Sequence, residues 1–182
     1  PATVIILIST NPFSLFPTVL SRCQMIRFGL LKRKEVAEIL KQKRSLEETQ
    51  ARFLASLCGG KVGKALSLDM DRIQDLRKQA WWILIPKEGV SADSFLKKAR
   101  ELSKDKEEME GVLSQLSSLS RDLVVLACSG KVSLLINEDM VSNLFEVARS
   151  LGSSRALKVW EVVEQTQELL RQNVNGQLAL ES

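Results

Sequence analysis

The sequence predicts a mainly α-helical protein that begins with a short α/β segment of two strands and one helix. Residues 4–8 form a continuous run of apolar and β-branched side chains, which is typical of a buried strand. From residue 32 onward, apolar side chains recur at helical spacings of three and four. Glycine and proline gather at the few places that separate these periodic stretches. We therefore expect three parts: residues 1–31, 32–69 and 70–182.

The first expected strand, Val4–Ile8, leads into a polar turn at residues 9–12. Asn11 before Pro12 favours a turn, because proline restricts the preceding residue and supplies no backbone donor. In parallel sheets, chemistry collects at the carboxyl ends of the strands. Thr10 and Asn11 occupy that position and are therefore candidate site residues.

A short helix and a second strand are expected to complete this first part. Ser14 can cap the helix, and Pro17 is tolerated within its first turn. The helix ends near Ser21-Arg22-Cys23, which we expect to be exposed, and the apolar residues of 25–28 begin the second strand.

Two motifs in this part resemble a known family. Ile-Leu-Ile-Ser-Thr-Asn-Pro at residues 6–12 resembles the sensor 1 strand of bacterial clamp-loader ATPases. Leu-Phe-Pro-Thr-Val-Leu-Ser-Arg-Cys-Gln at residues 15–24 resembles their Ser-Arg-Cys motif. These proteins belong to the AAA+ superfamily and act in the DNA polymerase III complex, where they open the sliding clamp and place it on primed DNA. The resemblance implies that residues 1–31 are the C-terminal remnant of an AAA+ ATPase-like domain.

The resemblance implies that Arg22 is an arginine finger, supplied in trans to the ATP site of a neighbouring subunit. A planar, permanently charged guanidinium suits γ-phosphate oxygens and the charge of a phosphoryl-transfer transition state. Ser21 and Cys23 would position the loop, with Cys23 as a small packed residue, and Thr10 and Asn11 would hold the sensor 1 position. Without the resemblance, Arg22 would be interpreted as a surface salt-bridge residue.

The second part is expected to contain three small helices. The first opens at Lys32, Ser45 is a candidate N-cap for the next with Glu48 completing a capping box, and Gly59-Gly60 ends that helix. The third covers residues 61–68. The pattern Gly-Gly-x-x-Gly-x-Ala-Leu at residues 59–66 is similar to the start of the last helix in an AAA+ lid domain.

Gly63 is a departure from the hydrolysing members of the family. It stands where they carry a sensor 2 arginine, and glycine has no side chain to meet a phosphate. In this respect the chain resembles the delta-prime family, whose members act as a stator that keeps the finger and has lost its own ATPase machinery. Alternatively, Gly63 serves close helix packing.

The basic residues gather between Lys32 and Arg44. This stretch contains six basic and two acidic residues, and six minus two gives +4, the net charge of the whole chain. Lys32, Arg33 and Lys34 are candidate contacts to DNA or phosphate, and a solvated helix face is the plainer interpretation. No aromatic residue interleaves these charges, which argues against a stacking platform for single strands.

The third part is expected to be all helix and turn. Its helices resemble the collar domain through which clamp-loader subunits form a ring, and residues 171–181 are similar to the family's C-terminal signature. Gly130 and Gly152 are expected to end helices, and a short helix is expected after Asn175-Gly176. Trp81-Trp82 is either a binding surface or core packing.

Composition excludes several kinds of site. The sequence contains no histidine, which removes Ser-His-Asp catalysis, and its three cysteines are too far apart for a zinc motif. We expect no metal or cofactor in this chain; ATP and Mg²⁺ would be bound by neighbouring subunits. No phosphate-binding loop is present, because Gly59–Ala65 has the wrong spacing and lacks the hydroxyl for Mg²⁺. We expect a cytoplasmic protein with no membrane segment, and a C-terminal piece of a longer chain.

The resemblance thus implies a clamp-loader stator subunit of the delta-prime family, part of the DNA-directed DNA polymerase III (nucleotidyltransferase) complex. Expected partners are gamma/tau and delta subunits through the collar, with the sliding clamp and primed DNA reached through the assembly. No activity is expected from this chain alone. Two alternatives stay open: an ATP-hydrolysing gamma/tau-type subunit and a non-catalytic helical interaction module.

Overall fold

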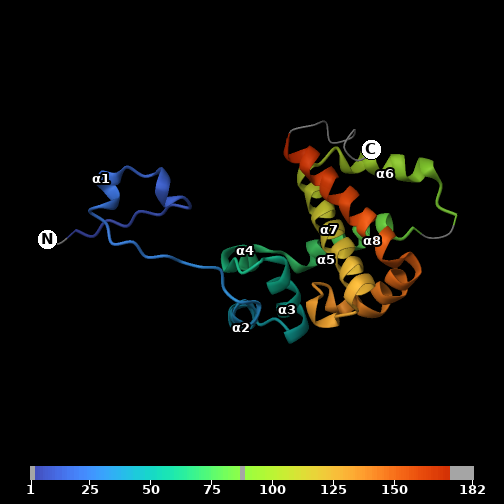
Figure 1. Cartoon of the computed structure of the whole chain (residues 1–182), viewed down its shortest axis with the longest axis horizontal. Helices are drawn as coiled ribbons and strands as arrows, with labels where there is room; N and C mark the ends of the chain where they lie inside the picture. Colours follow the sequence, from blue (N-terminus) through green and yellow to red (C-terminus); the bar gives the residue numbers. More distant parts are fainter. Residues whose placement is uncertain (1–2, 87–88, 173–182) are drawn as a thin grey trace. The chain divides into compact units, whose positions relative to one another are not determined.

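The computed structural model describes residues 3–86 and 89–172 and divides the chain into two compact units, Pro1–Leu30 and Leu31–Ser182 (Figure 1). The mainly helical prediction is confirmed: the described residues form helices and connecting turns, with no strand among them. The α-helices are α1 (Pro17–Leu20), α2 (Arg33–Arg44), α3 (Glu48–Leu57), α4 (Val62–Ser67), α5 (Met70–Leu84), α6 (Ala92–Leu102), α7 (Lys106–Ser129) and α8 (Val141–Arg171).

The two strands expected in the first unit are not formed. Residues 3–9 and 24–30 have no strand assignment, and their side chains are exposed, with Ile8 95% accessible. A strand exists only through ladder hydrogen bonds to a neighbouring strand, and the described part of the chain gives these residues none. The AAA+ remnant is therefore not shown by the fold of this unit.

The helix caps in the first unit also differ from the prediction. Asn11, not Ser14, caps the first helical turn: its side chain accepts from the Phe13 N–H at 3.1 Å, which starts a 3₁₀-helix, Pro12–Ser14. Ser14 is the last residue of that turn, and its hydroxyl donates to the Asn11 carbonyl at 2.8 Å. Pro17 then stands at the first position of α1.

The three small helices predicted for residues 32–69 are confirmed as α2, α3 and α4. They share one apolar core, in which Val36, Leu40, Leu54 and Ala65 have no accessible surface. Gly59 and Gly60 have φ of +53° and +83° and end α3, as expected for a left-handed helix terminus.

Ser45 was expected to cap α3, and this prediction is wrong. Ser45 is the C-cap of α2, with a left-handed φ of 50°, and its N–H donates to the Lys41 carbonyl. The residue before α3 is Glu47, which makes no side-chain cap hydrogen bond. A capping box is a short sequence pattern, and in this structure the serine ends the preceding helix instead of starting the next one.

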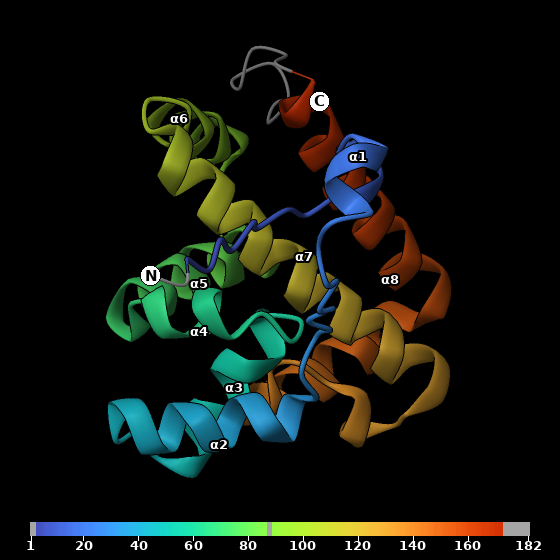
Figure 2. The same ribbon diagram turned by 90° about the vertical axis from the view of Figure 1, so that its left-hand side faces the viewer.

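The remaining helices form a bundle in which α7 packs along α8 and α5 packs against α7 (Figure 2). Leucines of α7 fill the core with residues of α8; the buried members include Leu116, Leu119, Leu123, Leu144 and Ala148. Ser91 caps α6 by accepting from the Ser94 N–H, and Gly130 ends α7 with φ of 64°. The prediction that Gly130 ends this helix is confirmed.

A break at Gly152 divides the long helix α8. Its φ of 71° and ψ of 167° lie in a region that is essentially restricted to glycine, so the predicted helix end at this residue is confirmed. Helical geometry resumes after it and continues to Arg171. The expected short helix after Asn175 and most of the C-terminal signature lie outside the described residues.

Candidate functional site

The Ser21-Arg22-Cys23 loop follows directly from the end of α1. Its backbone folds back on the helix: the Ser21 N–H donates to the Pro17 carbonyl at 2.9 Å and the Arg22 N–H to the Val19 carbonyl at 3.1 Å. The Ser21 hydroxyl donates to the Thr18 carbonyl at 3.3 Å. These short-range bonds hold the loop without using the Arg22 side chain.

Arg22 is exposed, and its guanidinium makes no hydrogen bond or ion pair with the described residues. A guanidinium in this state keeps all its donors for an external acceptor such as phosphate or carboxylate. Cys23 is exposed and free, so the expectation that it is a packed residue is wrong within this unit.

Thr10 and Asn11, the candidate sensor residues, differ in whether their side chains already make hydrogen bonds. Asn11 is committed to its own turn: its side chain caps the 3₁₀-helix, and its N–H donates to the Ser9 hydroxyl at 3.2 Å. Thr10 is exposed, and its hydroxyl has no partner in the described part of the chain. Of the two side chains, Thr10 is the one whose hydrogen-bonding capacity is unused.

Gly63 lies in the first turn of α4 and is exposed. A Cβ placed on Gly63 would meet no atom within 4 Å. The alternative that this glycine serves close helix packing is therefore wrong. Lys61 and Lys64 flank it and are exposed, with Lys61 preceding the helix and Lys64 in its last turn. The position has room for a long side chain, and none is present.

The basic residues at the start of α2 do not all face solvent. Lys32 and Lys34 are exposed, and the Lys32 N–H donates to the Glu35 carboxylate at 2.7 Å. The Arg33 side chain instead turns inward, with 32% of its surface accessible. Lys32 and Lys34 are thus the members of the candidate trio that remain open to a phosphate.

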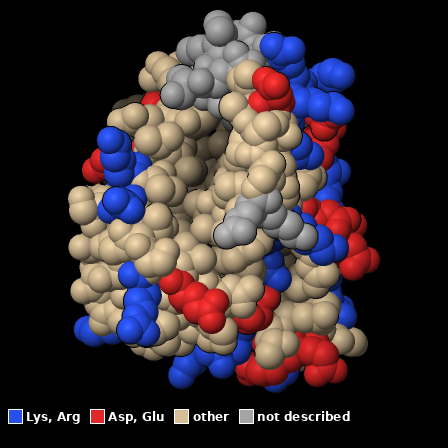
Figure 3. Space-filling model, turned by 90° about the vertical axis from the view of Figure 1, so that its right-hand side faces the viewer, with Lys and Arg blue, Asp and Glu red and all other residues tan. Residues whose placement is uncertain are grey.

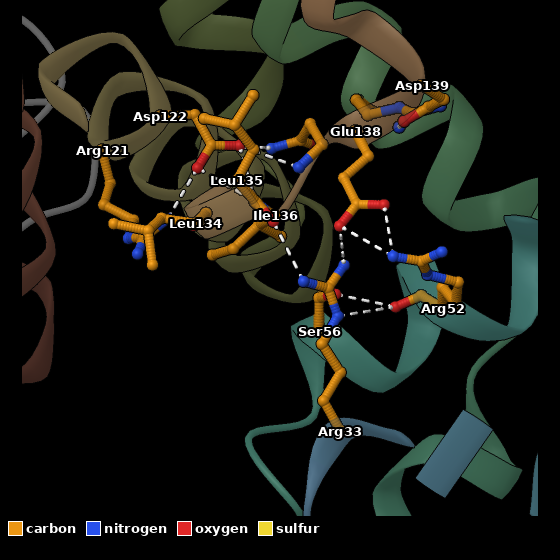
Figure 4. A network of polar contacts seen from close by, with 12 residues as sticks. Arg33, Arg52, Ser56, Arg121, Asp122, Leu134, Leu135, Ile136, Glu138 and Asp139 are labelled. Carbon is orange, nitrogen blue, oxygen red and sulfur yellow. Dashed lines mark hydrogen bonds and ion pairs between the residues drawn. The ribbon is translucent and has the colours of Figure 1, made fainter. Parts of the chain in front are cut away.

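Arg33 belongs to a polar junction between the three-helix group and the segment before α8 (Figure 4). Its Nη1 donates to the Leu135 carbonyl at 3.1 Å, and its Nη2 lies 3.1 Å from the Glu138 carboxylate. Arg52 of α3 contacts the other oxygen of Glu138, also at 3.1 Å. Glu138 therefore lies between two guanidiniums that come from different helices.

A third arginine supports the same junction. Arg77 of α5 makes a bidentate pair with Asp139, with distances of 2.9 and 2.7 Å. Its guanidinium also lies over the Phe53 ring, 4.3 Å from the ring centre. The contact joins α5, α3 and the turn that carries Glu138. Sequence reasoning did not find this junction, because its residues are far apart along the chain.

Asp122 is a fully buried carboxylate in the C-terminal half of α7. It accepts from the Ile136 and Asn137 N–H groups at 3.0 and 2.8 Å and from the Arg121 guanidinium at 2.8 Å (Figure 4). Arg121 also donates to the Leu134 carbonyl at 2.7 Å. These bonds fix the connection from α7 to α8. The signal missed in the sequence is an acidic residue inside an apolar stripe, between Leu119 and Leu123.

The described residues contain no group of three His, Cys, Asp or Glu side chains that could hold a metal ion. None of the helices described is both long and apolar enough to cross a membrane. Comparisons of the chain with protein-family models, with curated proteins and with solved structures found no match.

Proposed function

We propose that this chain is a stator subunit of a bacterial clamp loader, of the delta-prime family, that supplies Arg22 in trans to the ATP site of a neighbouring AAA+ subunit. The supporting observation is the state of Arg22: exposed, at the end of α1, with no partner among the described residues. It stands within the segment at residues 6–24 that resembles the family's sensor 1 and Ser-Arg-Cys motifs.

The chemistry asked of Arg22 is charge stabilisation. As the γ-phosphoryl group is transferred to water, negative charge spreads over its oxygens, and a guanidinium fork can meet two of them. Arg22 stays protonated throughout, so it moves no proton. Hydrolysis then depends on assembly, because the finger arrives only when two subunits pack together. The neighbouring subunit supplies ATP and Mg²⁺.

Gly63 supports the assignment to a stator rather than to a gamma/tau-type ATPase. An arginine at that position would have room to extend, since nothing lies within 4 Å of a Cβ there. The chain lacks that arginine. In this proposal the helices α5 to α8 act as the collar that joins gamma/tau and delta subunits. The assembly works in the cytoplasm, on the sliding clamp and primed DNA.

A non-catalytic helical interaction module is the second candidate. An apolar groove of about 450 Å³ favours it; the groove is lined by Ile83, Phe95, Leu96, Leu116, Val162 and Val163, among others. Figure 3 shows a hollow in one face of the molecule that is bordered mostly by uncharged residues. In this candidate Arg22 has no role in hydrolysis.

The test is the substitution Arg22→Ala in a reconstituted clamp loader, with DNA-stimulated ATP hydrolysis as the readout. Loss of an arginine finger is expected to slow hydrolysis at the neighbouring site by roughly 10³-fold or more. Arg22→Lys is expected to recover little, because a point charge lacks the fork geometry.

Arg27→Ala is the matched control, because Arg27 is also an exposed arginine of the first unit. It is expected to leave the rate unchanged. Sedimentation of each complex shows whether assembly is intact. An intact complex that carries Arg22→Ala and hydrolyses ATP at the parent rate would contradict the proposal and favour the interaction module.

A further inference from the structure

The two adjacent tryptophans have different surroundings. Trp81 packs against the core of the helical bundle. Trp82 instead lies against the Phe95 ring, with ring centres 5.2 Å apart and planes inclined by 36°. It lines an open hollow between α5 and α6. Core packing therefore explains why a tryptophan stands at position 81, but it does not explain the tryptophan at position 82.

The hollow beside Trp82 is lined by cations. Its volume is about 470 Å³, within the range of roughly 300–1,000 Å³ common for small-ligand sites. Lys78, Lys97 and Lys98 line it, against the single lining carboxylate of Glu101. Lys78 pairs with Asp75 at 2.8 Å. Lys97 and Lys98 have no ion pair within residues 3–86 and 89–172, so their charges are available to an external anion.

We propose that this hollow binds single-stranded nucleic acid, with one base stacked on Trp82 and the flanking phosphates contacted by Lys97 and Lys98. Base–aromatic stacking beside a positive groove is the usual way in which proteins hold single strands. Phe95 supports the indole from one side and fixes its orientation. The site depends on none of the residues assigned to ATP hydrolysis.

A further group in the hollow suits a base. The Oε1 atom of Gln79 is buried and has no hydrogen-bond partner among the described residues, while its Nε2 donates to Glu108 at 2.8 Å. Gln79 lines the hollow, so a bound base could supply the missing donor from a ring N–H, such as N3–H of thymine, or from an exocyclic amine. An acidic peptide could satisfy the lysines, but it would leave the Trp82 ring without a stacking partner.

The experiment measures binding of a fluorescently labelled oligo(dT) to the whole chain at low salt, by anisotropy. Trp82→Leu is expected to weaken binding by roughly tenfold or more, and Trp82→Phe to retain much of it. The double variant Lys97→Gln, Lys98→Gln is expected to flatten the plot of log K against log salt by about 1.4, because two phosphate contacts are lost at about 0.7 each. Lys97 is exposed and Lys98 is half-buried, and neither makes an ion pair with the described residues, so the double variant is expected to keep the fold.

The matched control is Lys131→Gln with Lys158→Gln, two exposed lysines outside the hollow. It is expected to leave the salt slope unchanged. Three outcomes would overturn the inference: no binding at low salt, equal weakening by the control pair, or an abasic strand that binds as well as oligo(dT). Competition by oligo-glutamate that also depends on Trp82 would identify a peptide site instead. Because no ATP hydrolysis is measured, failure here leaves the role of Arg22 untouched.

Discussion

Three arginines show how neighbouring groups decide what one side chain does. Arg33 donates to a backbone carbonyl and contacts Glu138, whereas Arg77 pairs with Asp139 over the Phe53 ring. Both therefore stabilise the junction between helices. Arg22 has the same five donors, but the described residues offer it no acceptor. Whether an arginine has donors free for an external partner therefore depends on its neighbours, because the residue type is the same in all three cases.

Alanine substitutions at two helical glycines, Gly63 and Gly111, are expected to change the free energy of unfolding differently. Gly63→Ala is expected to raise the free energy of unfolding by roughly 0.5–1 kcal/mol, because alanine is the better helix former and its Cβ meets nothing. Gly111→Ala places a Cβ 2.7 Å from Leu76, so overpacking offsets the helix gain. Urea unfolding of both variants checks the order. If Gly111→Ala were as stabilising as Gly63→Ala, the tight contact between α5 and α7 would be refuted.

The cysteines are expected to differ in reactivity. Burial raises the pKa of the Cys58 thiol above its ordinary value, and nearby Lys64 opposes this only in part. A raised pKa means less thiolate at a given pH, so iodoacetamide should modify exposed Cys23 and Cys128 first. The favourable burial of the neutral thiol is present below the ordinary pKa of 9.0 and is lost as the pH rises through the raised value. Mass spectrometry of peptides over a pH series measures each site; equal rates in the folded chain would contradict the burial.

At the scale of elements, the connection between α7 and α8 depends on Asp122. Asp122→Ala would leave the N–H groups of Ile136 and Asn137 without their acceptor in a buried site. We expect a loss of about 3 kcal/mol in the free energy of unfolding, since a buried hydrogen-bonded charge is removed from its partners. Faster hydrogen exchange of these two amides is the more specific readout.

Asp93→Ala is the control for this prediction, because Asp93 is an exposed acidic residue in the first turn of α6. Its loss is expected to cost no more than about 0.5 kcal/mol. Unchanged amide exchange in Asp122→Ala would show that the α7–α8 connection is held by packing alone.

For the whole molecule, the first unit exposes a large apolar surface. Val4, Ile6 and Ile8 are 82%, 80% and 95% accessible. An unpaired apolar segment with strand-forming residues invites pairing with another chain. We therefore expect the chain to associate as its concentration rises, in sedimentation equilibrium, and Ile6→Lys with Ile8→Lys to reduce this association.

Leu134→Lys is the control for association, because Leu134 is an exposed apolar residue outside the first unit. It is expected to leave association unchanged. A parent chain that stays monomeric across the concentration range would show that the exposed run has no tendency to pair.

The helical part was predictable because its signals are local. The spacing of apolar residues and the stop signals at Gly59, Gly130 and Gly152 each act within a few positions, and the structure has helices ending or breaking at all three. The strands were not predictable in the same way. Residues 4–8 have the composition of a strand, but a strand needs a partner, and the described residues provide none.

For the candidate site, too, local features were predictable from the sequence, whereas contacts between distant residues were not. The sequence alone determined the helices, most of their ends, and the residues at positions 22 and 63 that carry the proposed function. Only the tertiary structure decided that Arg33 is used internally, that Gly63 has open space around it, and that Trp81 and Trp82 face different surroundings. The physical reason is separation along the chain. Arg33 meets a carbonyl 102 positions away, and no local pattern encodes which distant group a side chain will reach.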